Sequence, residues 1–237
     1  MSATRTVPTA EFAEFAHIGD YLDPGPHALE MGVVRCPSGP LHVAVRADMH
    51  GCSGEMFEWW FRFAPDTGQY LWWHPLDHVS SRWTETSATT HIGSTHIVEE
   101  RLGPDPAVHP LQIHFVDPRE FFGDAYDQAL ERGDVSGCVA AQLGMGDEPL
   151  RDEKGRPNMG RMAHICRDND DGLVLRSHFY IGQGTGVAAE ALAEIVPDAL
   201  GLGLLHHSHT EWKYLATFLP GLFYGDRRTG HSVPSHW

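Results

Sequence analysis

Basic residues are scarce in this chain, and cysteines with metal-binding spacing are absent. There are 17 Lys and Arg residues against 32 Asp and Glu, which gives a formal net charge of -15 at pH 7. Such an acidic chain repels phosphate groups, so neither nucleic acid nor an anionic membrane surface is an expected partner. Four cysteines occur, and none forms the C-x-x-C pair of a zinc module built on thiolates.

Targeting segments and two familiar catalytic motifs are also missing. Residues 1–10 contain no apolar stretch of the signal-peptide kind, and the most apolar region, 187–205, is interrupted by acidic residues and Pro197. With its scattered cysteines, the chain is therefore predicted to be cytoplasmic. No G-x-S-x-G sequence occurs, which argues against a serine hydrolase of that type. The glycine-rich segment 182–186 lacks the P-loop lysine and the Rossmann spacing, so no nucleotide cofactor is expected.

The overall composition is that of a folded globular protein. Of the 237 residues, 41% are hydrophobic and 21% are charged, and 17 are histidines. No low-complexity linker or internal repeat divides the chain, so we expect one compact domain. Within it, residues 1–40 are predicted to form an N-terminal arm with a short helix, and residues 41–237 the main body.

The order of the predicted elements indicates an α+β fold. Residues 8–22 have the pattern of a short amphipathic helix, and residues 41–45 alternate as a strand. Ser53 can cap a helix that continues through Phe61. Further strands are predicted at 90–101, 108–117, 135–144, 159–168 and 172–182. Consecutive strands before a long C-terminal helix predict an antiparallel sheet with that helix on one face.

The predicted C-terminal helix carries the clearest chemical motif. It extends over 187–219, with a kink expected at Pro197 and an end at Pro220. His207 and Glu211 lie four residues apart, so both side chains lie on one face and can share a divalent metal ion. Because the flanking residues are apolar, this face should be partly buried, where an unpaired polar group is costly. The alternative is a solvated face on which the two side chains form a hydrogen bond.

Other polar residues compete for a place at this metal. Glu58 lies among bulky apolar residues, where a carboxylate either binds a cation or has a raised pKa. It can equally point outward, and Glu55 competes for the same role. His74 and His78 are also four residues apart, but Pro75 between them argues against a regular helix.

Several segments occur in an informative order. They are Glu55–Phe61, Trp73–His78, Met162–Asp168, Leu175–Tyr180 and His207–Glu211. Together they resemble the family of diacetylphloroglucinol and phloretin hydrolases over most of the chain. The resemblance implies a helix-grip (Bet v 1-like) fold, in which a curved antiparallel sheet wraps a long C-terminal helix and leaves a cavity.

The resemblance also implies an activity and a metal site. The chain is expected to be a zinc-dependent hydrolase acting on carbon–carbon bonds in ketonic substances. Its substrate would be an aromatic ketone, with an acyl group on a phloroglucinol-like or other polyphenolic or polyketide ring. The implied ligands of Zn²⁺, or of another divalent ion, are His27 on the N-terminal arm, Glu58, His207 and Glu211.

Roles for other residues follow from the same resemblance. His164 is implied as the catalytic proton donor, and Tyr180 as the group that hydrogen-bonds a phenol oxygen. Tyr21 is the nearest match to a substrate-binding tyrosine upstream of the first ligand. Trp60, Trp73 and Phe179 are expected to line the cavity.

The residues alone leave two alternatives open. One is a metal hydrolase for an ester, an amide or a β-diketone. The other is a non-catalytic helix-grip protein that binds an apolar ligand, which would need no cluster of His and Glu. The partner in each case is a small molecule, and a homodimer is compatible with the sequence.

Overall fold

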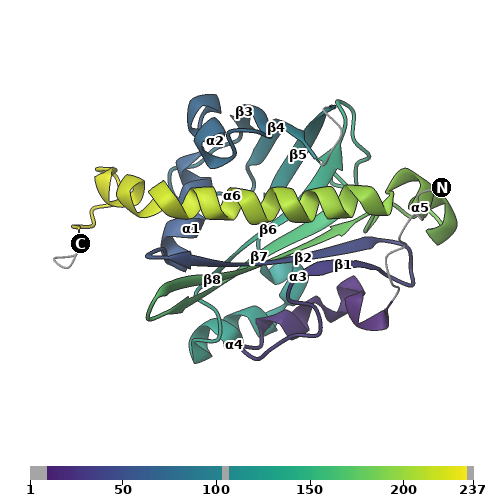
Figure 1. Cartoon of the computed structure of the whole chain (residues 1–237), viewed down its shortest axis with the longest axis horizontal. Helices are drawn as coiled ribbons and strands as arrows, with labels where there is room; N and C mark the ends of the chain where they lie inside the picture. The colour runs from purple at the N-terminus through teal and green to yellow at the C-terminus, as the bar shows by residue number, and fades with distance from the viewer. Residues whose placement is uncertain (1–9, 103–106, 234–237) are drawn as a thin grey trace.

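The computed structural model describes residues 10–102 and 107–233. Their strands form one antiparallel sheet of eight strands in the order β1-β2-β8-β7-β6-β5-β4-β3. A long helix, α6, runs across one face of this sheet (Figure 1). The predicted α+β class and the helix-grip arrangement are thereby confirmed.

The strands are mostly long; the predicted strands are present with shifted ends, whereas β1 and β3 were not predicted. They are β1 (Gly32–Arg35), β2 (Leu41–His50), β3 (His78–Thr84), β4 (Thr95–Arg101), β5 (Val108–Val116), β6 (Gly137–Met145), β7 (Gly160–Asn169) and β8 (Gly172–Ile181). Because β1 pairs with β2, the sheet already begins within the predicted N-terminal arm.

Helices cover both faces of the sheet. They are η1 (Glu11–Ala13), η2 (Phe15–Leu22), α1 (Gly54–Phe63), α2 (Thr67–Trp73), α3 (Arg119–Phe122), α4 (Asp124–Arg132), α5 (Ala189–Ile195) and α6 (Asp198–Gly225). Helices α1 and α2 flank α6 on the concave face, whereas η2, α3 and α4 lie together on the convex face (Figure 1). The predicted first helix is thus two short 3₁₀ helices within its described part.

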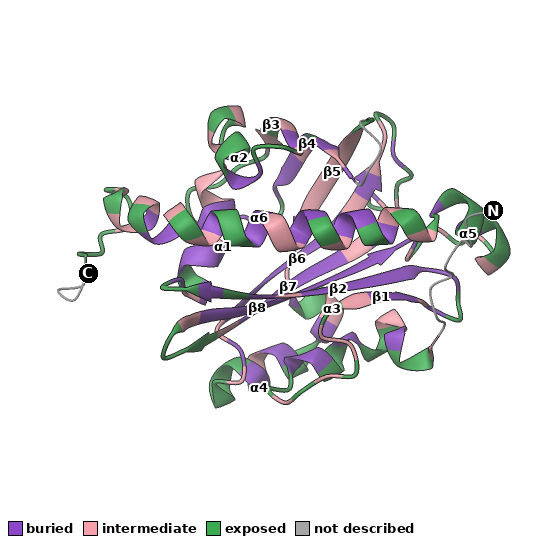
Figure 2. Cartoon of the chain, in the orientation of Figure 1, coloured by how far each residue is buried: buried purple, intermediate pink, exposed green. Residues whose placement is uncertain are grey.

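Strand alternation divides the interior into two cores. On β7, Met162 and Cys166 join the core under α6, whereas Ala163 and Ile165 join the core under η2 and α4. Successive side chains of a strand face opposite sides of the sheet, so each central strand must be apolar on both faces. Figure 2 accordingly shows the central strands buried along most of their length. This alternation decides which side chains can reach the concave cavity.

Two proline predictions had different outcomes. The chain breaks between α5 and α6 at Pro197, as predicted. The predicted end at Pro220 is wrong, because α6 continues through it to Gly225. Pro220 has no N–H to donate to the Ala216 carbonyl. The Cys52 thiol donates to that carbonyl instead, with Sγ 3.9 Å from the oxygen.

Local capping explains where the helices beside the cavity begin. The Ser53 side chain accepts a hydrogen bond from the Met56 N–H at 3.3 Å, which confirms the predicted start of α1. Helix α2 was not predicted, although Asp66 and Gln69 form a capping box at its start. Among the described residues, none of the helices combines the length and the apolar composition that crossing a membrane requires.

Candidate active site

A cavity lies between α6 and the concave face of the sheet. It has about 840 Å³ of empty volume, part of which is open to solvent. Its inner, buried part includes polar side chains, namely Tyr70, His96, Glu100, His164, His207, Ser208 and Glu211. The remainder of the lining is largely aliphatic, aromatic or thioether.

Around this cavity, His78, His207 and Glu211 form a group with metal-ligand spacing, and the Glu100 carboxylate lies beside both histidines. His78 begins β3, Glu100 lies opposite it on β4, and His207 and Glu211 project from α6. His78 Nε2 lies 3.6 Å from a Glu211 oxygen and 3.8 Å from a Glu100 oxygen. His207 Nε2 lies 3.5 Å from the second Glu100 oxygen and 3.9 Å from the Glu211 oxygen.

These separations suit a tetrahedral metal ion. Zinc–nitrogen and zinc–oxygen bonds of about 2.0–2.2 Å place neighbouring ligand atoms about 3.3–3.6 Å apart. The observed spacings of 3.5–3.9 Å are slightly wider than this. A small inward movement of side chains would therefore complete a site of two imidazoles and two carboxylates.

In both imidazoles the hydrogen bond is made by Nδ1, so Nε2 remains available to bind a metal ion. The Nδ1–H of His78 donates to the Tyr70 carbonyl at 2.9 Å, so its Nε2 carries a lone pair. That Nε2 is buried and has no hydrogen-bond partner within the described part of the chain, which is unusual for a buried polar atom. His207 Nδ1 lies 3.2 Å from an Asp77 oxygen, which likewise directs its Nε2 toward the carboxylates.

A neighbouring histidine is less suited to bind the ion. His74, Asp77 and His207 form a second group with ligand spacing. However, His74 Nδ1 accepts the Asp77 backbone N–H at 3.1 Å, so neutral His74 has its proton on Nε2. The ring of His74 stacks on that of His207 with centroids 4.7 Å apart. His74 therefore packs against His207, whose ring is oriented by Asp77.

Among the protein groups alone, protons held by His207 and Glu211 limit the net negative charge of the cluster. Burial lowers the pKa of His78 to about 2 and raises the pKa of Glu211 to about 8. Burial also opposes the charged form of His207, but Asp77, Glu100 and Glu211 outweigh it and raise the pKa of His207 to about 9. A divalent cation would favour neutral imidazoles and ionised carboxylates, so its binding would release protons.

Two further polar side chains occupy the cavity. The Tyr70 hydroxyl donates to the Glu100 carboxylate and so fixes the orientation of that side chain. His164 lies on β7, with Nδ1 2.8 Å from Ser177 Oγ and with Phe179 and Trp212 against its ring. Burial lowers the pKa of His164 to about 3, so its imidazole is neutral near pH 7.

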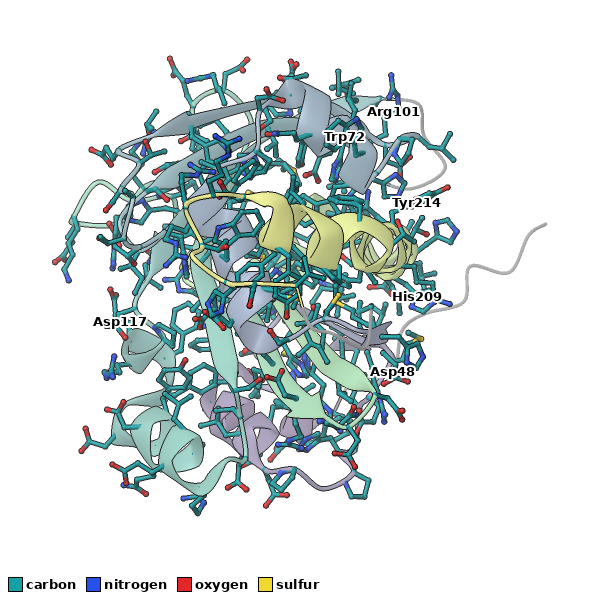
Figure 3. All side chains as sticks on the ribbon, turned by 90° about the vertical axis from the view of Figure 1, so that its left-hand side faces the viewer. Asp48, Trp72, Arg101, Asp117, His209 and Tyr214 are labelled. Atoms are coloured by element: carbon teal, nitrogen blue, oxygen red, sulfur yellow. The ribbon has the colours of Figure 1, made fainter. Side chains whose placement is uncertain are left out.

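The aromatic residues predicted for the cavity are only partly in place. Trp73 and Phe179 line it, as expected. Trp60 does not, because it lies on α1 behind Trp73, with the indole centroids 5.7 Å apart. On α2, Trp73 faces inward whereas Trp72 is 55% exposed on the surface that also carries Tyr214 (Figure 3).

The predicted tyrosines lie on the opposite face of the sheet. Tyr180 follows Phe179 on β8, so its side chain points to the convex face, where its ring stacks on His42. Tyr21 lies in η2 and packs on the ring of His178, with centroids 3.8 Å apart. Neither hydroxyl can reach the cavity through the sheet, so the predicted roles of both tyrosines require correction.

The predicted set of four metal ligands is not brought together. His27 precedes β1 on the convex side, where its ring contacts Tyr21. Glu58 faces away from the cavity on α1, and its carboxylate accepts the Cys138 N–H at 2.9 Å. Neither residue belongs to a group with ligand spacing among the described residues. The side chains that lie beside His207 and Glu211 are those of His78 and Glu100.

Asp77 offers a test of how the ligands are oriented. Its carboxylate accepts from His207 Nδ1 and is the only acidic group within hydrogen-bonding distance of that nitrogen among the described residues. Replacing Asp77 with Asn should weaken metal retention by about 10–100-fold, the usual cost of losing such a partner. The metal dissociation constant, measured by chelator competition, checks this. Asp66→Asn, which alters only the cap of α2, should leave that constant unchanged.

Comparisons with known proteins identify a family and two relatives of this chain. The family model described as the DAPG hydrolase PhiG domain matches residues 12–224. A 2,4-diacetylphloroglucinol hydrolase of Pseudomonas protegens is 27% identical over 87% of this chain and 71% of its own length. A phloretin hydrolase of Eubacterium ramulus is 26% identical over 76% of this chain and 66% of its own length.

A solved structure from Mycobacterium smegmatis, protein Ms6760, is 13% identical with a TM-score of 0.45. It matches over 81% of this chain and 98% of that one. The family match spans both flanks of the sheet and all four residues of the converging cluster. The chain belongs to the DAPG hydrolase family.

Proposed function

We propose that this protein is a metal-dependent hydrolase that cleaves the carbon–carbon bond between a phenolic ring and an acyl carbonyl. The observation that carries the proposal is the convergence of His78, Glu100, His207 and Glu211 beside an apolar cavity. The named activities of the relatives from Pseudomonas protegens and Eubacterium ramulus support the same substrate class. Zinc is the proposed ion, because it accepts imidazole and carboxylate ligands in tetrahedral geometry.

The reaction forms a bond between the acyl carbon and a water oxygen, and it breaks the bond between the acyl carbon and the ring carbon. A bound zinc ion supplies Lewis acidity, which polarises a carbonyl or lowers the pKa of water. Water adds to the acyl carbon, and the carbon–carbon bond then breaks. Its electron pair goes to the ring carbon, where the phenolic oxygens delocalise the charge. One proton of the water ends on that ring carbon, and the acyl group leaves as a carboxylic acid.

His164 is suited to move this proton. Its imidazole is neutral near pH 7, because burial lowers its pKa to about 3. It therefore begins as an acceptor and donates only after it has taken a proton from the attacking water. The hydrogen bond between Nδ1 and Ser177 fixes the ring, and the packed aromatic residues exclude bulk water.

Product analysis tests this function. Purified protein should contain about one divalent ion per chain and convert monoacetylphloroglucinol to phloroglucinol and acetate in equal amounts. In water labelled with ¹⁸O, the label should appear in acetate and not in phloroglucinol. Cleavage of esters but not of aryl ketones would favour the alternative metal hydrolase. Binding without turnover of either would favour a ligand-binding protein.

A further inference from the structure

The open part of the cavity is apolar although it is accessible to solvent. Six half-buried side chains line it, and we refer to them together as the apolar vestibule: Leu111, Ile113, Leu143, Met145, Met159 and Leu200. The ligand cluster at the inner end is fully buried by contrast. A molecule that enters the cavity must therefore pass, or remain beside, a wall without charge or hydrogen-bonding side chains.

Strand pairing builds most of this wall from two neighbouring strands, and Met159 and Leu200 complete it from the loop before β7 and from α6. On β5 and β6, Leu111 pairs with Met145 and Ile113 pairs with Leu143. These residues alternate with Gln112, Gln142 and His114, which point to the convex face. These strand segments are therefore apolar only on the face that lines the cavity, and polar on the opposite face.

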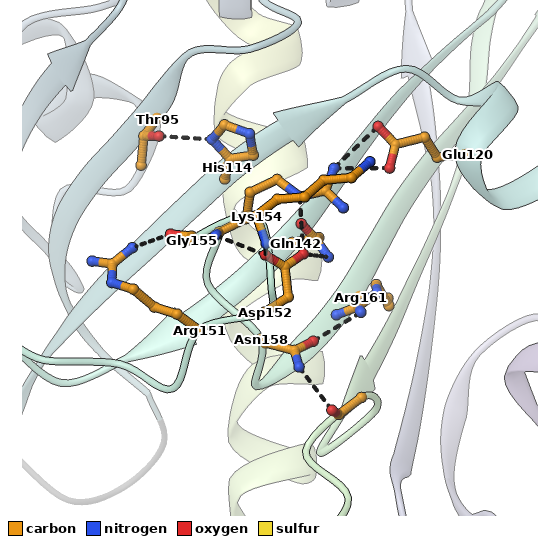
Figure 4. A network of polar contacts seen from close by, with 12 residues as sticks. Thr95, His114, Glu120, Gln142, Arg151, Asp152, Lys154, Gly155, Asn158 and Arg161 are labelled. Carbon is orange, nitrogen blue, oxygen red and sulfur yellow. Dashed lines mark hydrogen bonds and ion pairs between the residues drawn. The ribbon is translucent and has the colours of Figure 1, made fainter.

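The polar network on the outer face holds the wall in place. Asp152 accepts the backbone N–H groups of Lys154 and Arg156 at 2.9 Å, and Arg156 pairs with Glu120 (Figure 4). At the end of this loop the Met159 N–H donates to the Leu143 carbonyl at 2.7 Å, and the Met159 carbonyl accepts the Gly182 N–H at 2.7 Å. The backbone at Met159 is thus fixed on both sides before any ligand binds.

The vestibule extends well beyond the ligand cluster. Leu200 precedes His207 on α6 by two helical turns, which is about 10 Å along the helix axis. Part of this apolar surface stays in contact with water, and covering it with an apolar group is favourable. A hydroxylated ring placed here would lose hydrogen bonds to water and find no partners among the six side chains.

We propose that the substrate is a ketone with an apolar arm several carbons long, which lies in the vestibule while the carbonyl faces the ligand cluster. This proposal rests on the proposed function for the position of the carbonyl. It adds that affinity comes mainly from the arm. Each methylene group buried along the wall is expected to increase binding by up to about fourfold, until the arm reaches beyond Leu200.

A chain-length series tests the arm in the intact protein. The substrates are acylphloroglucinols with acyl groups from acetyl to decanoyl. We expect kcat/KM to rise about two- to fourfold per added methylene and then to level off. A flat series, or one that falls after acetyl, would overturn the proposal.

Two leucines of α6 provide a matched pair of variants. Leu200→Gln places an amide in the vestibule, whereas Leu202→Gln changes an outward-facing side chain that is 55% exposed. Leu200→Gln should lower the octanoyl-to-acetyl ratio of kcat/KM by roughly tenfold, and Leu202→Gln should leave that ratio unchanged. Equal ratios in both variants would contradict the assignment of the arm to this wall.

Binding without reaction separates this inference from the proposed function. Resorcinol and its 4-ethyl, 4-butyl and 4-hexyl derivatives contain no ketone to cleave, and calorimetry can measure their affinities. Affinity that rises with alkyl length, with a negative heat-capacity change, would support the vestibule even if no ketone is hydrolysed. Ketone hydrolysis together with equal affinities for all four resorcinols would overturn the vestibule and leave the proposed function intact.

Discussion

Replacing His78 with alanine is expected to release the divalent metal and abolish hydrolysis. His78 is one of the four side chains of the cluster, and its Nε2 has no hydrogen-bond partner among residues 10–102 and 107–233. Loss of a direct ligand should weaken metal binding by more than the 10–100-fold that loss of an outer partner costs. Metal content after dialysis and turnover of an acylphloroglucinol, measured on one preparation, give the result. Glu100→Gln should have the same effect.

Matched controls distinguish this ligand set from the one implied by the family resemblance. His27→Ala and Glu58→Gln should both keep the metal, because the two side chains lie away from the cluster. Glu99→Gln is the control for Glu100→Gln, since Glu99 is the exposed neighbour on the same strand and binds Ser80. Metal loss in His27→Ala with retention in His78→Ala would contradict the cluster described here.

Replacing His164 with alanine should lower kcat by roughly 10²–10⁴-fold and leave the metal in place. The imidazole is buried in the cavity but lies outside the converging cluster. Since its folded-state pKa is about 3, the neutral form predominates throughout the range from pH 5 to 8. The kcat of the wild type should therefore show no inflection from His164 in that range. Any change with pH there must come from other groups.

A purely structural His164 would give a different pattern. Its hydrogen bond to Ser177 joins β7 to β8, so its loss can also lower the melting temperature. His164→Gln keeps a side chain able to reach Ser177 but cannot serve as a proton relay near pH 7. Low turnover in both variants with full metal content supports the catalytic role. Normal turnover in His164→Gln would refute it.

The fold could be predicted well because its signals are local. Alternation within β7 and β8 and the turn between them is visible in the sequence, and Ser53 marks the start of α1. The same alternation also limits which side chains can face the cavity. Phe179 and Tyr180 are neighbours on one strand, so at most one of them can face α6. Assigning both to the substrate was therefore inconsistent with the strand itself.

Half of the proposed metal site could be predicted, for the same reason. His207 and Glu211 are one helical turn apart, and the register of a helix needs no information from elsewhere. His78 and Glu100 meet only because β3 pairs with β4, across a register shift after His78. Pro75 correctly argued against a helix there, but a strand that begins at His78 was not considered. Non-local pairing of short strands is what a single sequence conveys least well.

Locating the metal ion would decide whether these four side chains bind it. Crystals of the zinc-loaded protein, measured above and below the zinc absorption edge, would locate the ion by its anomalous scattering. We predict one peak about 2.0–2.2 Å from His78 Nε2, His207 Nε2 and an oxygen each of Glu100 and Glu211. A peak beside His27 or Glu58, or full occupancy elsewhere with this cluster empty, would contradict the account.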